Sequence, residues 1–239
     1  MTSVTLPVYR WLILQDGSLP INPDGTRNVG TPHRCTCTLV WPEGASPAPG
    51  DTLVVDPSLD GPGYGEAVLR LRTVGIAWQG VGRHLVTHPH GDHRVRGRET
   101  DLCGCGQVFA VREAGELSGL QVVPCPGHHE RHVAVRFASR DGDTWVTGDA
   151  ILGEDWLRAW QYYWPNGYRR EEIAQTWRTV AAVLSHADLV IPGHGPPVRV
   201  TRELLADLIE GFGRAEYHKD CLEVRGLLEG RMGRMSRGT

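Results

Sequence analysis

The sequence predicts a layered α/β or α+β domain in which helices pack over β-sheet. Short strand-like segments separated by turns come first, and strands alternate with amphipathic helices later in the chain. The length of 239 residues fits one domain or two small ones, and the content of 40% hydrophobic and 22% charged residues is typical of a globular protein. These observations exclude a fibrous or disordered chain.

The first part of the chain is expected to be rich in β-structure. A loop rich in Gly, Asn and Pro separates two predicted strands, Val8–Leu14 and Cys35–Trp41. A short apolar strand is predicted at Thr52–Asp56, and apolar residues at helical spacing predict a helix over Tyr64–Val74. The next strand, Leu85–Thr87, runs directly into a cluster of histidines.

The second part should contain both strands and helices. Short apolar or alternating segments predict five strands, at Val108–Val111, Gln121–Val123, Val133–Ala138, Trp145–Thr147 and Asp188–Ile191. Asp141 and Gly142 mark a hairpin turn. Helical spacing of apolar residues predicts three helices, at Glu171–Ser185, Thr201–Gly211 and Ala215–Arg231.

Composition also limits the function. The formal net charge is −3 with acidic and basic residues interspersed, so nothing favours nucleic acid or an anionic membrane as a partner. No apolar run reaches the roughly 18–20 residues of a membrane helix, and Met1–Trp11 lacks the pattern of a secretory signal. We therefore expect a cytoplasmic protein whose thiols are mostly reduced.

Two C-x-C pairs leave two interpretations open. Cys35 with Cys37, and Cys103 with Cys105, could form a structural zinc site if the fold brings the pairs together. The favoured alternative is that Cys35 and Cys37 are small buried residues on one face of a strand. The spacing differs from the usual C-x2-C pattern.

Four predicted strands each end at residue types that bind metals. These segments are 85–93, 125–128, 146–149 and 190–194. In the first, His88, His90, Asp92 and His93 fall within six residues, which a tight loop could direct at two adjacent metal ions. Histidine is rare, so a chance polar loop is the less favoured explanation. Imidazole and carboxylate ligands suit zinc, and iron and manganese accept similar ligands.

With these motifs, residues 8–200 resemble the metallo-β-lactamase-fold superfamily, the αββα hydrolases that include glyoxalase II and the acyl-homoserine lactonases. The resemblance implies an α/β fold of four layers, a sandwich of two mixed sheets flanked by helices. It also implies a catalytic domain at residues 1–200 and a C-terminal helical extension at 201–239 that packs on or continues it. Thr52–Asp56 resembles the strand whose terminal Asp supports the metal site in that superfamily.

The resemblance also implies the metal ligands. The first metal would be held by His88, His90 and His128. The second would be held by Asp92, His93 and His194, and Asp149 would bridge both metals. Two zinc ions are the expected cofactors, with iron or manganese as alternatives. The final motif, Ile191-Pro192-Gly193-His194-Gly195, matches the family closely.

These ligands predict a hydrolase. A hydroxide shared by two metals about 3.5–4 Å apart would attack an ester, lactone or thioester, and Asp92 would be the catalytic residue that passes a proton to the leaving group. A mononuclear iron enzyme similar to persulfide dioxygenases is the alternative, because two His and one Asp can form an open iron site. A metal-binding protein with little turnover is a third reading. The expected partner is a small-molecule substrate, and the C-terminal helices could pair in a homodimer.

Other residues carry weaker signals. The aromatic segment Trp156, Trp160, Tyr162, Tyr163 and Trp164 could wall an apolar pocket, or could fix a loop to the core or form a dimer contact. One of Tyr162 and Tyr163 could assist an oxyanion, as in lactonase relatives. Arg94–Arg98 could bind an anion, but a solvated face is favoured. The remaining histidines are expected to be structural (His84), next to the ligand His128 in sequence (His129), close behind the ligands (His132), or at the surface (His33, His186 and His218).

Overall fold

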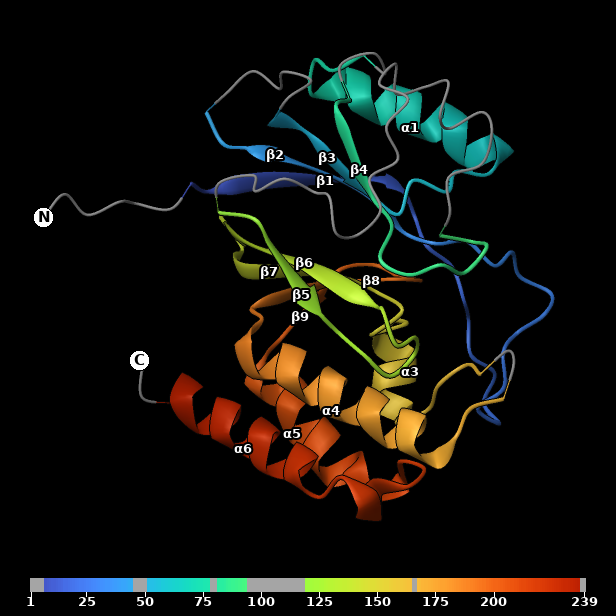
Figure 1. The fold of residues 1–239 in the computed structure, drawn as a ribbon, viewed down its shortest axis with the longest axis vertical. Coiled ribbons are helices and arrows are strands. Elements are labelled where there is room, and N and C mark those ends of the chain that lie inside the picture. The colour runs from blue at the N-terminus through green and yellow to red at the C-terminus, as the bar shows by residue number, and fades with distance from the viewer. Residues whose placement is uncertain (1–6, 45–50, 78–80, 94–118, 165–166, 237–239) are drawn as a thin grey trace, which may run out of the picture.

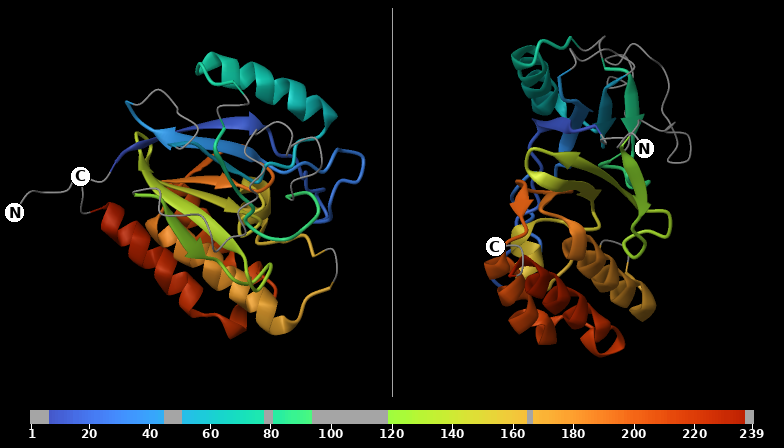
Figure 2. Two further views of the ribbon diagram at one scale, coloured as in Figure 1. Left: turned by 45° about the horizontal axis from the view of Figure 1, so that its top comes forward. Right: turned by 90° about the vertical axis from the view of Figure 1, so that its left-hand side faces the viewer.

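The computed structural model describes residues 7–44, 51–77, 81–93, 119–164 and 167–236. Within these ranges, nine strands form a mixed sheet with helices on both sides (Figures 1 and 2). The strand order is β4-β3-β2-β1-β6-β7-β8-β9, with β5 paired to β6. The predicted combination of mixed β-structure and covering helices is therefore confirmed.

The first half of the sheet contains four strands, β1 (Tyr9–Gln15), β2 (Cys37–Pro42), β3 (Leu53–Val55) and β4 (Arg83–Leu85). Helix α1 (Gly61–Thr73) covers its outer face (Figure 1). The strand predicted at Leu85–Thr87 is wrong in its bounds, because β4 ends at Leu85. Beyond it the backbone turns, and the Thr87 N–H donates to a carboxylate instead of a neighbouring strand.

The second half contains the other five strands, β5 (Gln121–Pro124), β6 (Val133–Ser139), β7 (Gly142–Gly148), β8 (Leu189–Pro192) and β9 (Val198–Arg199). β6 and β7 form the predicted hairpin, and β7 and β8 run parallel. The two-residue β9 is too short to leave a pattern in the sequence. The strand predicted at Val108–Val111 lies outside the described residues.

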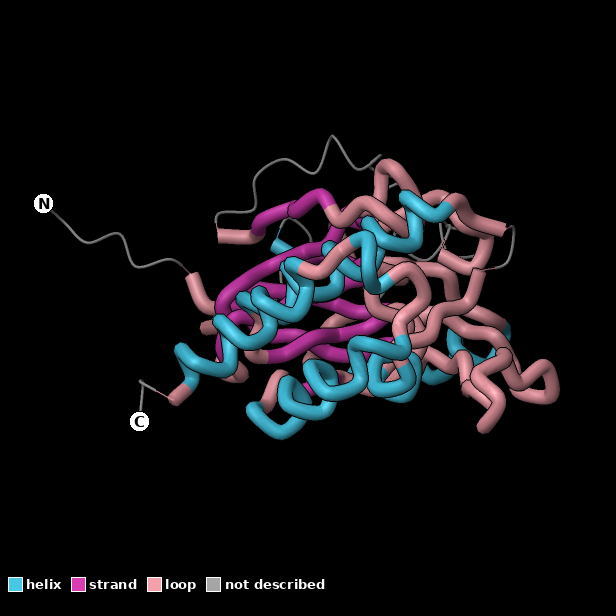
Figure 3. Tube along the Cα trace, turned by 90° about the horizontal axis from the view of Figure 1, so that it is seen from below, coloured by secondary structure: helices cyan, strands magenta, loops and turns pink. Residues whose placement is uncertain are grey.

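Four helices cover the outer face of the second half, α3 (Glu154–Ala159), α4 (Arg170–His186), α5 (Arg202–Gly211) and α6 (Glu223–Met235) (Figure 3). The apolar stripe predicted for α4 is buried as expected, including Trp177 and Leu184. The helix predicted from Ala215 is wrong in its first turns. Tyr217 has a positive φ of 54°, so the chain forms short turns there and α6 begins only at Glu223.

The core consists of three main layers of apolar side chains. One lies between α1 and the first half of the sheet, and one between the second half and its helices. The third joins the two halves and includes Val55, Leu85, Val135 and Phe137. Tyr9 pairs with Ser139 and connects all nine strands of the described ranges, so the second sheet of the predicted sandwich is not resolved as a separate sheet. α5 and α6 share the apolar cluster of α4.

None of the helices in the described ranges has the length and apolar character of a membrane-spanning helix.

Candidate metal centre

The loop that follows β4 carries four of the seven predicted ligands and is folded around Asp56. The Thr87 N–H donates to Asp56 Oδ1 at 2.7 Å, and the Thr87 hydroxyl donates to Oδ2 at 2.8 Å. Asp56 itself has a φ of 52°, which is uncommon for a residue other than glycine. This conformation, held by buried hydrogen bonds, places the carboxylate below the histidine cluster, as the resemblance implied.

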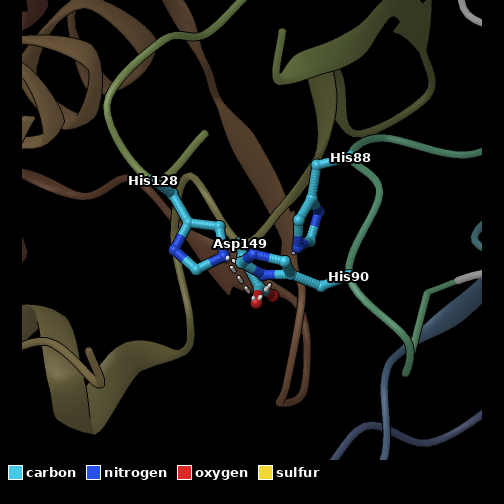
Figure 4. A group of neighbouring side chains, drawn as sticks. All are labelled: His88, His90, His128 and Asp149. Atoms are coloured by element: carbon cyan, nitrogen blue, oxygen red, sulfur yellow. Dashed lines mark hydrogen bonds and ion pairs between the residues drawn. The ribbon is translucent and has the colours of Figure 1, made fainter. Parts of the chain in front are cut away.

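The first ligand group contains His88, His90, His128 and Asp149. Figure 4 shows the three imidazoles turned towards the Asp149 carboxylate. His128 Nε2 lies 2.9 Å from His90 Nδ1 and 3.4 Å from Asp149 Oδ2. His88 Nε2 lies 3.6 Å from the same oxygen. The four ligand atoms lie within 4.8 Å of one another, which is the spacing expected around one metal ion.

The second ligand group contains Asp92, His93, His194 and again Asp149. Nε2 of His93 and Nε2 of His194 lie 3.1 Å and 3.0 Å from Asp149 Oδ1. The same two nitrogens lie 3.7 Å and 3.6 Å from Asp92 Oδ2. All seven predicted ligands are therefore brought together, and each oxygen of Asp149 faces a different group.

Hydrogen bonds on the far side of the rings direct the histidine nitrogens inward. His93 Nδ1 lies 2.9 Å from Asp56 Oδ2, and His194 Nδ1 lies 2.7 Å from the backbone oxygen of Arg34. Both partners accept hydrogen bonds, so each Nδ1 carries a proton and each Nε2 faces the other ligand atoms. His88 Nδ1 lies 3.1 Å from the Thr87 hydroxyl and is placed in the same way.

The inward-facing atoms fit metal ions. Within the described residues, three of these atoms are buried and contact only other members of the two groups: His88 Nε2, His93 Nε2 and Asp149 Oδ1. Buried polar atoms rarely stay unpaired, and metal coordination would satisfy these. Two groups of His and Asp that share one carboxylate indicate a binuclear metal site.

The ligands differ in charge state. Burial lowers the pKa of His128 to about 4, and it lowers the pKa of His88 well below the usual value. Burial acts in the same direction on His93, but the carboxylates of Asp149 and Asp56 outweigh it and raise the pKa of His93 well above the usual value. Burial raises the pKa of Asp149, yet His194 and His93 hold it well below its usual value.

Close backbone approach sets the position of Asp149. A Cβ atom at Gly193 would overlap Asp149 Oδ1 and the backbone of Gly148, so only glycine fits there. This contact brings the turn after β8, which carries His194, against the end of β7. The Gly193 of the predicted Pro-Gly-His motif therefore has a packing role at the metal centre.

Part of the aromatic segment has one of its predicted roles, which is to fix loops to the core. Trp156 and Trp160 are buried, and their indole N–H groups donate to the backbone oxygens of Leu19 and Leu208, so they fix loops to the core. Tyr162 lies next to His128, with ring centroids 5.5 Å apart, and its hydroxyl is buried without a hydrogen bond in the described part of the chain. Burial raises the pKa of Tyr162 well above its usual value.

Sequence reasoning missed two residues at the centre. Tyr168 stacks on His128, and its hydroxyl donates to the His128 backbone oxygen at 2.8 Å. His33 was expected at the surface, which is wrong: its Nε2 lies 3.0 Å from Asp92 Oδ2. His33 lies on a long loop, where no periodic pattern reports on burial. The only available signal was the position of His33 just before the strand that was predicted to begin at Cys35.

The other side chains followed expectation in part. His132 stacks on His88 with ring centroids 4.8 Å apart, as expected for a residue just behind the ligands. His84 is buried and His186 is exposed, whereas His218 is half-buried and packs against Phe212. Cys35 and Cys37 are buried and reduced. Cys103, Cys105 and Arg94–Arg98 lie outside the described residues, so the cysteine zinc site stays a prediction.

Known proteins are similar to this chain in sequence and in fold. No family model matches the chain. It is 30% identical over 226 residues to metallo-beta-lactamase domain-containing protein 1 of Homo sapiens, an alignment that covers 84% of this chain and 80% of that protein.

Solved structures agree with this similarity. A metallo-beta-lactamase family protein of Thermus thermophilus matches with a TM-score of 0.51 and 19% identity, over 84% of this chain and 81% of the other. An AiiA variant of B. thuringiensis, with N-decanoyl-L-homoserine bound at its active site, matches with a TM-score of 0.50 and 14% identity, over 80% of this chain and 94% of that one. The chain belongs to the metallo-β-lactamase-fold superfamily.

Proposed function

We propose that this chain is a dinuclear metal-dependent hydrolase that acts on an ester, lactone or thioester of a small molecule. One observation carries the proposal: the two oxygens of Asp149 face two separate groups of buried ligand atoms. A carboxylate in that position can bridge two metal ions. Zinc is the metal that we expect, because the ligands are imidazole and carboxylate.

The residues of the metal centre would have different roles in the reaction. When bound, two divalent ions would make water nucleophilic at neutral pH and polarise the substrate carbonyl. Asp149 and the six remaining ligands would hold the ions. Burial raises the pKa of Asp92, but the hydrogen bond with His33 and the nearby His93 outweigh this and lower it, so its carboxylate is ionised. In this state Asp92 can accept a proton and pass it to the leaving group.

Aromatic side chains beside the first group support an organic substrate. Tyr162, Trp164 and Tyr168 pack in sequence next to His128, with centroids 4.3 Å apart at each step. The Tyr162 hydroxyl stays protonated and can donate to the developing oxyanion. The ligand bound in the AiiA structure has an acyl chain, which is the kind of group that such a wall would contact.

The first experiment is elemental analysis of protein purified without chelator or added metal. About two zinc ions per chain, followed by hydrolysis in a panel of lactones, thioesters and aryl esters, would support the proposal. About one iron with little zinc, together with oxygen uptake in the presence of a persulfide, would contradict it and favour the dioxygenase alternative. Two bound metals without turnover on any of these substrates would limit the chain to metal binding.

A further inference from the structure

The loop of residues 16–36, between β1 and β2, borders the second ligand group and is firmly seated there. The Thr36 N–H donates to the Gly193 backbone oxygen at 2.6 Å, and the indole of Trp156 donates to the Leu19 backbone oxygen at 2.6 Å. Leu19 and Ile21 pack in one apolar cluster with Trp156 and Tyr163. The loop therefore presents its polar side chains at defined positions beside the metal centre.

His33 is the residue of this loop that reaches furthest into the centre. Its Nε2 lies 3.0 Å from Asp92 Oδ2 and 3.4 Å from His194 Nε2. The Asp92 carboxylate accepts a hydrogen bond from His33, and His194 Nε2 is one of the predicted metal ligands. His33 is not among the seven ligands, and its side chain is partly exposed, so the ring forms an edge of the site that a substrate can contact.

Two further polar groups continue this edge outward. The ring of Tyr163 meets His33 edge-on, with centroids 6.0 Å apart. The guanidinium of Arg27 lies over the Tyr163 ring, 5.4 Å from its centroid, and its Nη1 lies 3.4 Å from the Tyr163 hydroxyl. In the described part of the chain, Arg27 forms no ion pair, and its buried Nε makes no hydrogen bond.

We propose that Arg27 and Tyr163, next to the ring of His33, form a subsite that binds an anionic group of the substrate, a carboxylate or phosphate. A guanidinium without a carboxylate partner favours such a group, since its planar set of donors matches two oxygens at once. Arg27 donates to the Tyr163 oxygen, which leaves the Tyr163 hydroxyl proton for the ligand. The subsite rests on the proposed function, because the anion would place a hydrolysable bond at the metal centre.

The test compares Arg27→Gln with Arg10→Gln, a matched control. Arg10 also stacks on an aromatic ring, at 5.3 Å from the centroid of Trp41, but lies on β1 among residues that are not part of the centre. The zinc-loaded proteins are titrated with succinate and with inorganic phosphate by calorimetry, which requires no turnover. We expect Arg27→Gln to weaken binding of at least one anion about tenfold, the contribution of one charge-assisted hydrogen bond, and Arg10→Gln to change neither.

A second test measures the hydrolysis of esters with and without a negative charge. We expect Arg27→Gln to raise KM for the anionic half-ester para-nitrophenyl succinate about tenfold, with little change for neutral para-nitrophenyl acetate. Tyr163→Phe, which keeps the ring, should show a smaller effect in the same direction. Preference for succinate or for phosphate in the calorimetry assigns the subsite to one class of anion.

Each arm can fail separately. Anion binding that depends on Arg27, without ester hydrolysis, would keep the subsite and overturn the proposed hydrolase. Equal losses on the neutral and the anionic ester, or unchanged affinity for both anions, would overturn the subsite. A lowered melting temperature with unchanged anion affinity would assign Arg27 a purely structural role.

Discussion

The two ligand groups contain the same kinds of side chain but differ in what surrounds them. In the first group, His88 and His128 pack against other rings, namely His132 and Tyr168, and burial lowers both pKa values. In the second, His93 lies between the carboxylates of Asp149 and Asp56, which raise its pKa. The imidazoles of His88 and His128 are therefore neutral and ready for a metal ion, whereas His93 in the second group holds a proton that the metal ion must displace.

This difference indicates that the residues next to the ligands, more than the ligands themselves, determine the affinity of each group for its metal ion. Imidazole must be neutral to bind a metal ion, so a proton on His93 competes with the metal. The same carboxylates that hold this proton would afterwards stabilise the bound cation. We therefore expect the first group to fill at lower metal concentration, and the second to be the more sensitive to pH and to mutation of its surroundings.

The largest effect is expected from Asp149→Ala, which removes the residue that both groups share. Metal content should fall below two ions per chain, and turnover should fall by about three orders of magnitude or more. Elemental analysis and a hydrolysis assay measure both. Asp143→Ala is the matched control, because Asp143 is also on β7 but pairs with Arg136, 2.6 Å away. Full metal content with unchanged turnover in Asp149→Ala would rule out a bridging role.

A more selective change is Asp56→Asn, which removes one carboxylate from His93 and keeps the side-chain size. We expect the affinity of the second metal to fall by about ten- to a hundredfold, as for other residues that orient metal ligands, and the first to change little. Competition with a chromophoric chelator resolves the two binding steps. Equal weakening of both steps would show that the groups do not differ in the way described. Asp143→Asn again serves as the control.

Acidification should separate the groups without mutation. The pKa of His93 is raised, so below that raised value the proton stays bound until metal displaces it, and affinity for the second metal should fall about tenfold per pH unit. The pKa of His128 is about 4, so the first group should lose little affinity down to about pH 5. Calorimetry in buffers of different ionisation enthalpy counts the released protons. Release of protons by the first metal and not the second would reverse the comparison.

The smallest effect is expected from Tyr168→Phe, which keeps the ring stacked on His128 but removes the hydrogen bond to its backbone oxygen. The free energy of unfolding should fall by about 1 kcal/mol, and affinity for the first metal by a few-fold. Chemical denaturation and the chelator titration measure these changes. Tyr217→Phe, at an exposed tyrosine under Arg170, is the control and should change neither. A loss confined to the second metal would contradict the assignment of Tyr168 to the first group.

Much of the metal centre could be predicted from the sequence because its ligands follow strand ends in short, dense motifs. His88, His90, Asp92 and His93 stand in one loop, and Asp149 and His194 each follow a buried strand. The structure brings these residues and His128 into two groups, and it places Asp56 in contact with His93. The local sequence showed the metal-binding residue types at strand ends, whereas the assignment of seven ligands to two metals came from the resemblance to the superfamily.

Features that depend on long-range contacts could not be predicted in this way. His33 reaches Asp92 only because hydrogen bonds join the 16–36 loop to Gly193 and Trp156, which lie far away in the sequence. The single pairing of Tyr9 with Ser139, which connects the sheet, likewise depends on the meeting of distant strands. The irregular turns before α6 follow from the positive φ of Tyr217, which no hydrophobic pattern reports.

The single backbone pairing between the halves of the sheet has a thermodynamic consequence. His88, His90, Asp92 and His93 follow β4 in the first half, whereas His128, Asp149 and His194 follow β5, β7 and β8 in the second. Each ion would therefore act as a cross-link between two halves that are joined in the described residues by an apolar layer, one β-pair and a few hydrogen bonds such as that from the Thr36 N–H to the Gly193 oxygen. A metal ion at a thousandfold excess over its dissociation constant adds about 4 kcal/mol to folding. Chelation should thus lower the melting temperature, and loss of metal would weaken the contact between the two halves of the sheet.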